Sequence, residues 1–171
     1  PHAKPAAANF AKLARSWRNA GGKVIHCHQT FTDDDFLLPS GKIDEEAKAK
    51  CPLFEGSFNA SFYPGVAEPE DIIIRKKRYS AVAGSNLLDV IRSKGYESVI
   101  VGGLTTPICV GTTVDGLSMA QLKVTLLSDC CASQAIGPFS AEVAHDFTVE
   151  RIKYLFGQIT TSSELIDSLK G

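Results

Sequence analysis

The sequence predicts an α/β fold in which helices cover both faces of a parallel β-sheet. Strand-length apolar segments alternate with segments of helical periodicity along most of the chain. The predicted strands are apolar throughout, which is typical of strands in a parallel sheet that is buried on both sides. A chain of 171 residues is also long enough for one core, so we expect a single domain over residues 1–171.

The chain opens with a predicted helix over residues 6–20. Four apolar side chains recur at helical spacing on one face of this helix: Phe10, Leu13, Ala14 and Trp17. Gly21 and Gly22 end the helix, because glycine readily adopts the backbone conformation that closes a last turn. Residues 23–27 then form a short buried strand.

Residues 28–69 are predicted to be irregular, apart from a short helix over residues 44–50. A loop of this length inside a compact domain usually serves a function. It carries six aromatic side chains, namely Phe31, Phe36, Phe54, Phe58, Phe62 and Tyr63. These side chains either line a pocket, bury a subunit contact or pack the loop onto a core of its own.

The second part of the chain alternates regularly between strands and helices. The predicted strands are 71–75, 98–101, 123–127 and 157–160. The predicted helices are 85–94, 109–120, a long helix from Ser140, and 162–169. In the long helix we expect four side chains on the buried face: Val143, Ala144, Phe147 and Ile152.

The composition argues for a protein that acts on a small molecule. The formal net charge is −1 and no basic cluster dominates, so we expect no nucleic-acid partner. No apolar run approaches the roughly 20 residues that cross a bilayer, so we expect no membrane partner. No signal peptide is recognisable, although the sequence starts at Pro1 without a methionine, which leaves room for a leader.

The cysteines indicate a reducing compartment. There are five of them, an odd number, and their spacing does not match a small disulfide scaffold. We therefore expect free thiols and a cytoplasmic location, although export by an unconventional route would leave the same pattern.

Reactive residues are expected where parallel strands end, because ligands of open α/β sheets bind beyond the carboxyl ends of the strands. The strand end at 102–109 carries Cys109 after two glycines, at the predicted start of a helix. Free backbone N–H groups and the helix dipole there favour a thiolate and could hold an oxyanion. The alternative is that Cys109 is a buried small apolar side chain, as most free cysteines are.

Lys76 follows the predicted strand 71–75. A lysine at a strand's carboxyl end can stabilise a nearby thiolate or carry a proton. The alternative is that Lys76 is a solvated member of the basic run 75–78, and position alone favours this alternative.

Two motifs resemble those of the isochorismatase-like cysteine hydrolases, a family that includes nicotinamidases, N-carbamoylsarcosine amidases and ureidoacrylate amidases. Residues 76–81, Lys-Lys-Arg-Tyr-Ser-Ala, resemble the family's Lys-x-x-Tyr-Ser-Ala-Phe. Residues 103–110, Gly-Leu-Thr-Thr-Pro-Ile-Cys-Val, resemble its Gly-Val-x-Thr-x-x-Cys-Val. The stretch 124–133 resembles the strand and turn that follow, so the similarity runs from the first helix to the C-terminus.

The resemblance implies a three-layer α/β/α fold around a six-stranded, Rossmann-like parallel sheet. It implies a catalytic triad of Asp, Lys and Cys, in which Cys109 matches the nucleophile and Lys76 the lysine. Leu104 and Thr105 match the family's non-proline cis peptide beside the oxyanion hole. Tyr79 and Thr106, within the motifs, are expected to contact substrate. The family also implies a homo-oligomer, either a dimer or a tetramer, and we expect no cofactor.

The sequence departs from the family in three places. The first central strand, which carries the triad Asp, has no counterpart here, so we expect the given sequence to lack that strand. Val82 replaces the usual Phe and is expected to reshape the substrate pocket. Family nicotinamidases bind a metal through Asp-x-His and a further His, where this chain has His26 and His28. We expect these two side chains to point to opposite faces of their strand and therefore to hold no metal. His28 is expected to contact substrate or to be a plain polar residue.

The expected reaction is hydrolysis of a small amide or related C–N bond through a covalent acyl-enzyme on Cys109. One alternative is an isochorismatase that cleaves the vinyl ether of isochorismate, although known isochorismatases often lack the cysteine. Another alternative is a non-catalytic binding protein on the same scaffold, which the missing Asp would favour.

Overall fold

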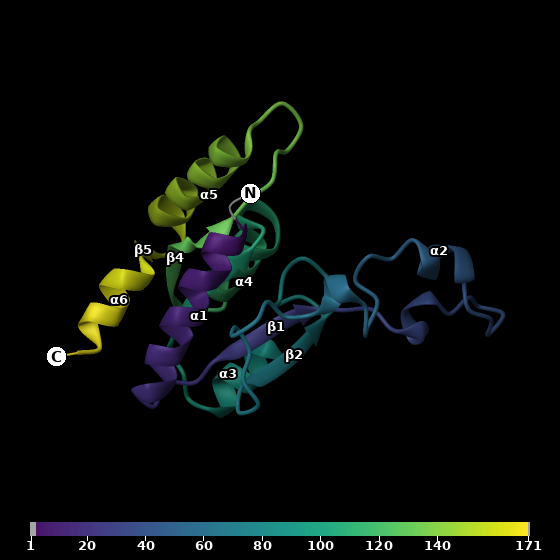
Figure 1. The fold of residues 1–171 in the computed structure, drawn as a ribbon, viewed down its shortest axis with the longest axis horizontal. Coiled ribbons are helices and arrows are strands. Elements are labelled where there is room, and N and C mark those ends of the chain that lie inside the picture. Colours follow the sequence, from purple (N-terminus) through teal and green to yellow (C-terminus); the bar gives the residue numbers. More distant parts are fainter. Residues whose placement is uncertain (1–2, 171) are drawn as a thin grey trace.

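The computed structural model describes residues 3–170 (Figure 1). Its helices are α1 (Ala3–Asn19), α2 (Glu45–Ala49), α3 (Leu87–Ser93), α4 (Gly111–Met119), α5 (Ala141–Leu155) and α6 (Ser162–Ser168). Its strands are β1 (Ile25–Gln29), β2 (Ile72–Lys76), β3 (Ser98–Leu104), β4 (Lys123–Ala132) and β5 (Gln158–Thr160). Two 3-10 turns, Asp33–Phe36 and Phe58–Ala60, and one π-helical turn, Thr106–Val110, complete the elements. None of the described helices has both the length and the apolar character of a membrane span.

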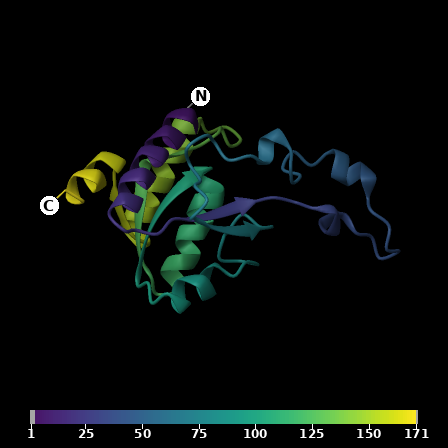
Figure 2. The same ribbon diagram turned by 60° about the horizontal axis from the view of Figure 1, so that its bottom comes forward.

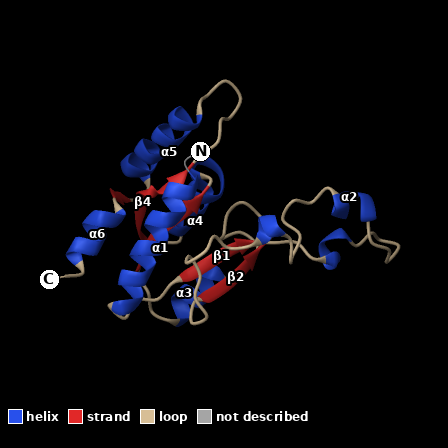
Figure 3. Cartoon of the chain, viewed as in Figure 1, coloured by secondary structure: helices blue, strands red, loops and turns tan. Residues whose placement is uncertain are grey.

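Helices cover both faces of the parallel strands, which gives the chain three layers (Figure 3). Successive residues of a strand point to opposite faces, and the consecutive pairs 126–127 and 130–131 of β4 divide in this way. Leu127 and Cys130 of β4 join Leu13 of α1 in one apolar cluster, which residues of α6 complete. Leu126 and Cys131 belong to the second and larger cluster, together with residues of α3, α4 and α5. The predicted α/β fold with a helix-covered parallel sheet is therefore confirmed.

The parallel strands form two groups rather than one continuous sheet. β1 pairs with β2, and β3, β4 and β5 form the second group in that order. Among the described residues, four strands therefore have an unpaired edge, where a continuous sheet would have two. That a central strand lies outside the given sequence, and that residues 1–171 form one domain, both stay predictions.

The chain between β1 and the Phe58–Ala60 turn extends away from the layered body, with α2 far from the strands (Figures 1 and 2). We call it the projecting segment. Its two limbs are joined by backbone hydrogen bonds of Phe31 to Leu53 and Glu55. Asp35 forms ion pairs with Arg75 of β2 and with Lys77, which ties the base of the segment to the strand. The predicted irregular region with one short helix is therefore present, and it extends away from the body.

The buried face of α5 differs from the prediction. Ala144, Thr148 and Ile152 are buried, whereas Val143 is 51% and Phe147 is 70% exposed. The buried stripe repeats every four residues, and the hydroxyl of Thr148 donates a hydrogen bond to the carbonyl of Ala144. Because that hydroxyl is satisfied, a polar residue occupies the core face and the larger apolar side chains face outward.

Asp71, directly before β2, anchors the end of α1 to the strands. Its carboxylate is 1% exposed and accepts hydrogen bonds from Arg18 of α1 and from His26 of β1. The backbone N–H of Glu68 donates a further bond. Burial alone would raise the pKa of Asp71, but the hydrogen bonds and the positive charge of Arg18 outweigh it and lower the pKa to about 2.

We expect Asp71→Asn to destabilise the fold by about 3 kcal/mol, because the mostly buried guanidinium of Arg18 loses its counter-charge. Since folding lowers the pKa of Asp71 from about 3.8 to about 2, its stabilisation is complete above pH 4 and disappears as the pH falls towards 2. Urea unfolding at several pH values measures both effects. The exposed Asp34→Asn variant is the control and should match the wild type. An Asp71→Asn variant with wild-type stability at pH 7 would contradict the assignment.

Candidate active site

Three chain segments meet beyond the carboxyl end of the β1–β2 pair. Gln29 and Lys76 are the last residues of β1 and β2 and lie opposite each other in the parallel register. The third segment is the π-helical turn after β3, which carries Cys109. Lys76 was expected just after its strand. It is instead the final strand residue, so the pairing with β1 fixes its backbone.

Lys76 is a buried cation surrounded by oxygen atoms. Lys76 is only 5% exposed to solvent. Its Nζ donates to Oε1 of Gln29 at 2.9 Å and to the carbonyl oxygens of Arg78 at 3.0 Å and Tyr79 at 3.1 Å. Sγ of Cys109 lies 3.6 Å from the same nitrogen. Within residues 3–170, Lys76 forms no ion pair with a carboxylate, so the thiol is the acidic group that contacts its ammonium.

The turn that carries Cys109 differs from the predicted helix start. α4 begins only at Gly111, and Cys109 lies in the preceding π-helical turn. In that turn the N–H of Val110 donates five residues back, to the carbonyl of Thr105, so the first turn is wider than an α-helical one. Upstream, the peptide bond between Leu104 and Thr105 is cis, and Gly103 has a φ of +146°, which side chains disfavour.

Two hydrogen bonds hold the site loops on the helices behind them. The N–H of Ala81 donates to Oγ1 of Thr113 on α4 at 2.9 Å, in the buried core. Oγ1 of Thr106 lies 2.8 Å from Nδ1 of His145 on α5. Thr106 is completely buried, and this contact with His145 satisfies its hydroxyl. The two loops that carry Lys76 and Cys109 are thereby fixed to the same layer of helices.

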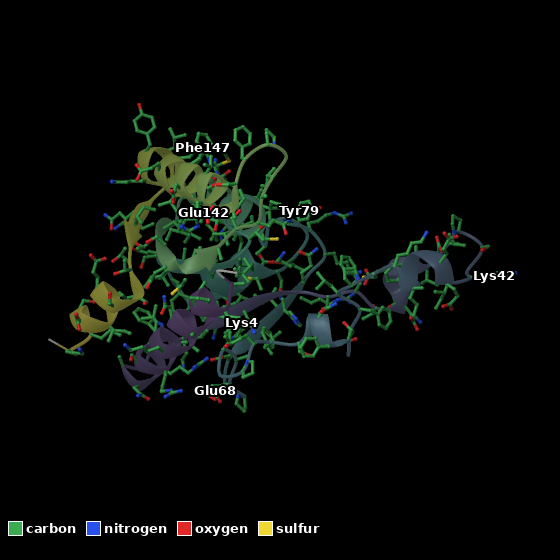
Figure 4. The ribbon with its side chains drawn as sticks, turned by 45° about the horizontal axis from the view of Figure 1, so that its top comes forward. Lys4, Lys42, Glu68, Tyr79, Glu142 and Phe147 are labelled. Carbon is green, nitrogen blue, oxygen red and sulfur yellow. The ribbon has the colours of Figure 1, made fainter. Side chains whose placement is uncertain are left out.

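Two of the other predicted site residues have exposed side chains. Tyr79 is 62% and Leu104 is 46% exposed, and Figure 4 shows Tyr79 at the surface. Val82 is partly buried and packs closely on Gly116 of α4. A β-carbon added to Gly116 would lie only 3.0 Å from the β-carbon of Val82. Contacts of substrate with these residues, with Thr105 and with Thr106 stay predictions.

His26 and His28 lie on the same face of β1, which corrects the sequence-based expectation of opposite faces. Alternate residues of a strand share a face. Accordingly, both rings lie against Phe62, with centroid distances of 5.2 Å for His26 and 4.3 Å for His28. Nε2 of His26 is hydrogen-bonded to the carboxylate of Asp71. In the described part of the chain, no group of three or more potential ligands could hold a metal ion. A contact of His28 with substrate stays a prediction.

Gln29 is the residue of this site that the sequence analysis did not single out. Its Oε1 accepts from Nζ of Lys76 and lies 3.8 Å from Sγ of Cys109. The available signal was its place at the carboxyl end of a strand, which is also the place of Lys76. A separate cavity of about 300 Å³ lies between the N-termini of α1 and α5 and the end of β4, and neither Lys76 nor Cys109 lines it.

Comparison with known proteins places the chain in a family. The family model of the isochorismatase domain matches residues 1–164. The chain belongs to the isochorismatase family. The predicted resemblance to the isochorismatase-like hydrolases is therefore confirmed. The prediction that the chain is a hydrolase of this family is confirmed with it.

Individual relatives agree with this family assignment. Ureidoacrylate amidohydrolase RutB of Enterobacter sp. (strain 638) is 32% identical over 105 residues, which are 61% of this chain and 43% of that protein. RutB of Agrobacterium fabrum is 27% identical over 95% of this chain and 75% of its own length. The cysteine hydrolase from Pseudomonas syringae pv. phaseolicola 1448A superposes with a TM-score of 0.83 at 24% identity, over 99% of this chain and 82% of that one.

The site geometry predicts which of the five thiols is alkylated first. We expect iodoacetamide at pH 7 to label Cys109 about tenfold faster than Cys51, because the Lys76 ammonium contacts the Cys109 sulfur and stabilises its thiolate. Burial raises the pKa of Cys27 to about 11 and of Cys131 to about 12, so these two should stay unlabelled, as should the buried Cys130. Peptide mass mapping over time measures each rate. Equal rates at positions 109 and 51 would show that Cys109 is not activated.

Proposed function

We propose that this chain is a cysteine hydrolase that cleaves a small amide or related C–N bond through a covalent acyl-enzyme. The observation that carries the proposal is the contact of 3.6 Å between Nζ of the buried Lys76 and Sγ of Cys109. A buried ammonium beside a thiol favours the thiolate–ammonium pair that a nucleophilic cysteine needs. The names of the RutB relatives, which are amidohydrolases, support an amide as the bond that is cleaved.

The reaction can be balanced with these two side chains alone. The thiolate of Cys109 attacks the substrate carbonyl carbon, and the N–H groups of Thr105 and Cys109 stabilise the resulting oxyanion. The C–N bond then breaks while Lys76 gives a proton to the leaving amine. Water attacks the thioester, and neutral Lys76 accepts the proton of that water. The carboxylic acid leaves, and the thiolate–ammonium pair is restored.

We expect Cys109→Ala and Cys109→Ser to lower kcat for hydrolysis by at least about a thousandfold, because no nucleophile remains. Lys76→Met should cost about a hundredfold or more through the lost proton transfer. Ammonia release from ureidoacrylate, other ureido acids and primary amides measures the activity, and circular dichroism checks the fold. Cys51→Ala, on the projecting segment, is the matched control and should keep full activity. An active Cys109→Ala variant would refute the nucleophile.

Assays of the same purified protein test two other functions. Incubation with isochorismate followed by detection of pyruvate identifies an isochorismatase. A binding protein is favoured by the observation that, among the described residues, no carboxylate contacts Lys76. Slow, unselective alkylation of Cys109 together with inactivity on every amide would favour the binding protein.

We also propose that the chain self-associates and resides in the cytoplasm. Three side chains on the outer face of α5 are strongly exposed, with Val143 at 51%, Phe147 at 70% and Tyr154 at 86%. Figure 4 labels Phe147 among them. A second copy that covered this face would remove an apolar stripe from water. The five cysteines are all free, which suits a reducing compartment.

Sedimentation velocity tests the self-association. We expect a dimer or tetramer at micromolar concentration, and Phe147→Glu should shift it towards monomer because a charge would be buried in the interface. Phe58→Glu changes an even more exposed aromatic, at the end of the projecting segment, and should leave the assembly intact. A monomeric wild-type chain would exclude the proposal.

A further inference from the structure

One amide group contacts both reactive side chains of the candidate active site. Oε1 of Gln29 lies 2.9 Å from Nζ of Lys76 and 3.8 Å from Sγ of Cys109, while Nζ and Sγ are 3.6 Å apart. The three atoms therefore form a small triangle. The register of β1 and β2 fixes two of its corners, because Gln29 and Lys76 are paired residues at the ends of parallel strands.

The hydrogen-bonding capacity of Lys76 makes the amide important. An ammonium group has three N–H donors and no acceptor. Three oxygen atoms accept from it, those of Gln29, Arg78 and Tyr79. The sulfur of Cys109, 3.6 Å away, is a fourth acceptor and shares these three donors with the oxygens. Two of the oxygens belong to the main chain, and Gln29 supplies the one side-chain oxygen.

Gln29 is also the one partner of these three that suits both charge states of Lys76. After Lys76 gives up a proton, its nitrogen has two donors and a lone pair. A main-chain carbonyl can only accept, so it cannot bond to that lone pair. The Gln29 amide can rotate and present its N–H group to the neutral amine, since its oxygen and nitrogen ends are close in shape.

We propose that Gln29 is a positioning residue that holds the ammonium of Lys76 against Cys109 and supports the neutral amine during turnover. This inference rests on the proposed roles of Lys76 and Cys109. Gln29 acts through Lys76, so its substitution should alter the charge balance at the sulfur as well as the rate of hydrolysis.

The central experiment measures the pH midpoint of Cys109 alkylation by iodoacetamide in four variants. Gln29→Leu removes the acceptor, frees the lysine side chain and should raise the midpoint by about one pH unit. In a Lys76→Met background the same change should add no further shift, because the residue through which Gln29 acts is gone. Gln158→Leu, the same change at an exposed strand residue, is the control and should leave the midpoint unchanged.

A second variant tests the exchange of roles in the amide. Gln29→Glu keeps an acceptor for the ammonium but cannot donate to the neutral amine, so kcat should fall about tenfold or more with little change in KM. If Gln29→Leu does not fold, the Gln29→Glu variant still tests the role of Gln29. A wild-type kcat in Gln29→Glu would overturn the inference.

The outcomes separate this inference from the proposed function. If Lys76→Met leaves the midpoint unchanged, the proposed Lys76–Cys109 pair itself fails. If Lys76→Met shifts the midpoint but Gln29→Leu leaves it unchanged or lowers it, the pair stands and the role of Gln29 is refuted. An additive shift in the double variant would likewise refute it, because it would show that Gln29 acts independently of Lys76.

Discussion

A lysine ammonium that is almost closed off from water must find oxygen partners, and the site is organised around that requirement. The parallel pairing of β1 with β2 brings the Gln29 amide to Lys76, and the chain after β2 turns back so that two of its carbonyl groups accept from the same nitrogen. The π-helical turn after β3 then places the sulfur of Cys109 at this cation. Strand register, loop path and the turn before α4 therefore have to agree for the site to exist.

Much of the arrangement follows from rules that apply to any parallel α/β chain. The alternation of apolar strands and helices predicts the layered fold, because each element must bury one face against the next. The same rule places Lys76 and Cys109 close together, since the carboxyl ends of parallel strands share one edge of a sheet. The sequence also located the strands correctly to within a few residues, although β4 continues to Ala132, five residues beyond the predicted end at Leu127.

The errors arise from side-chain chemistry at some positions and from strand geometry at others. The exposure of Phe147 could not be foreseen because a satisfied threonine hydroxyl takes the core face of α5. The expectation for His26 and His28 was wrong because alternate strand residues share a face, and Phe62 packs against both rings. Gln29 was overlooked because a neutral amide gives no signal until the register shows that it faces a cation.

The adjacent Cys130 and Cys131 carry a consequence for how the folded state can be studied. One thiol belongs to the apolar cluster that contains α1 and α6 residues and its neighbour belongs to the larger cluster, so two consecutive side chains sample opposite layers. Both thiols are buried, so each becomes accessible to a reagent through opening of its own surroundings. Thiol-exchange kinetics under native conditions would thus give two separate opening free energies from a single dipeptide, and would tell whether the layers come apart together or independently.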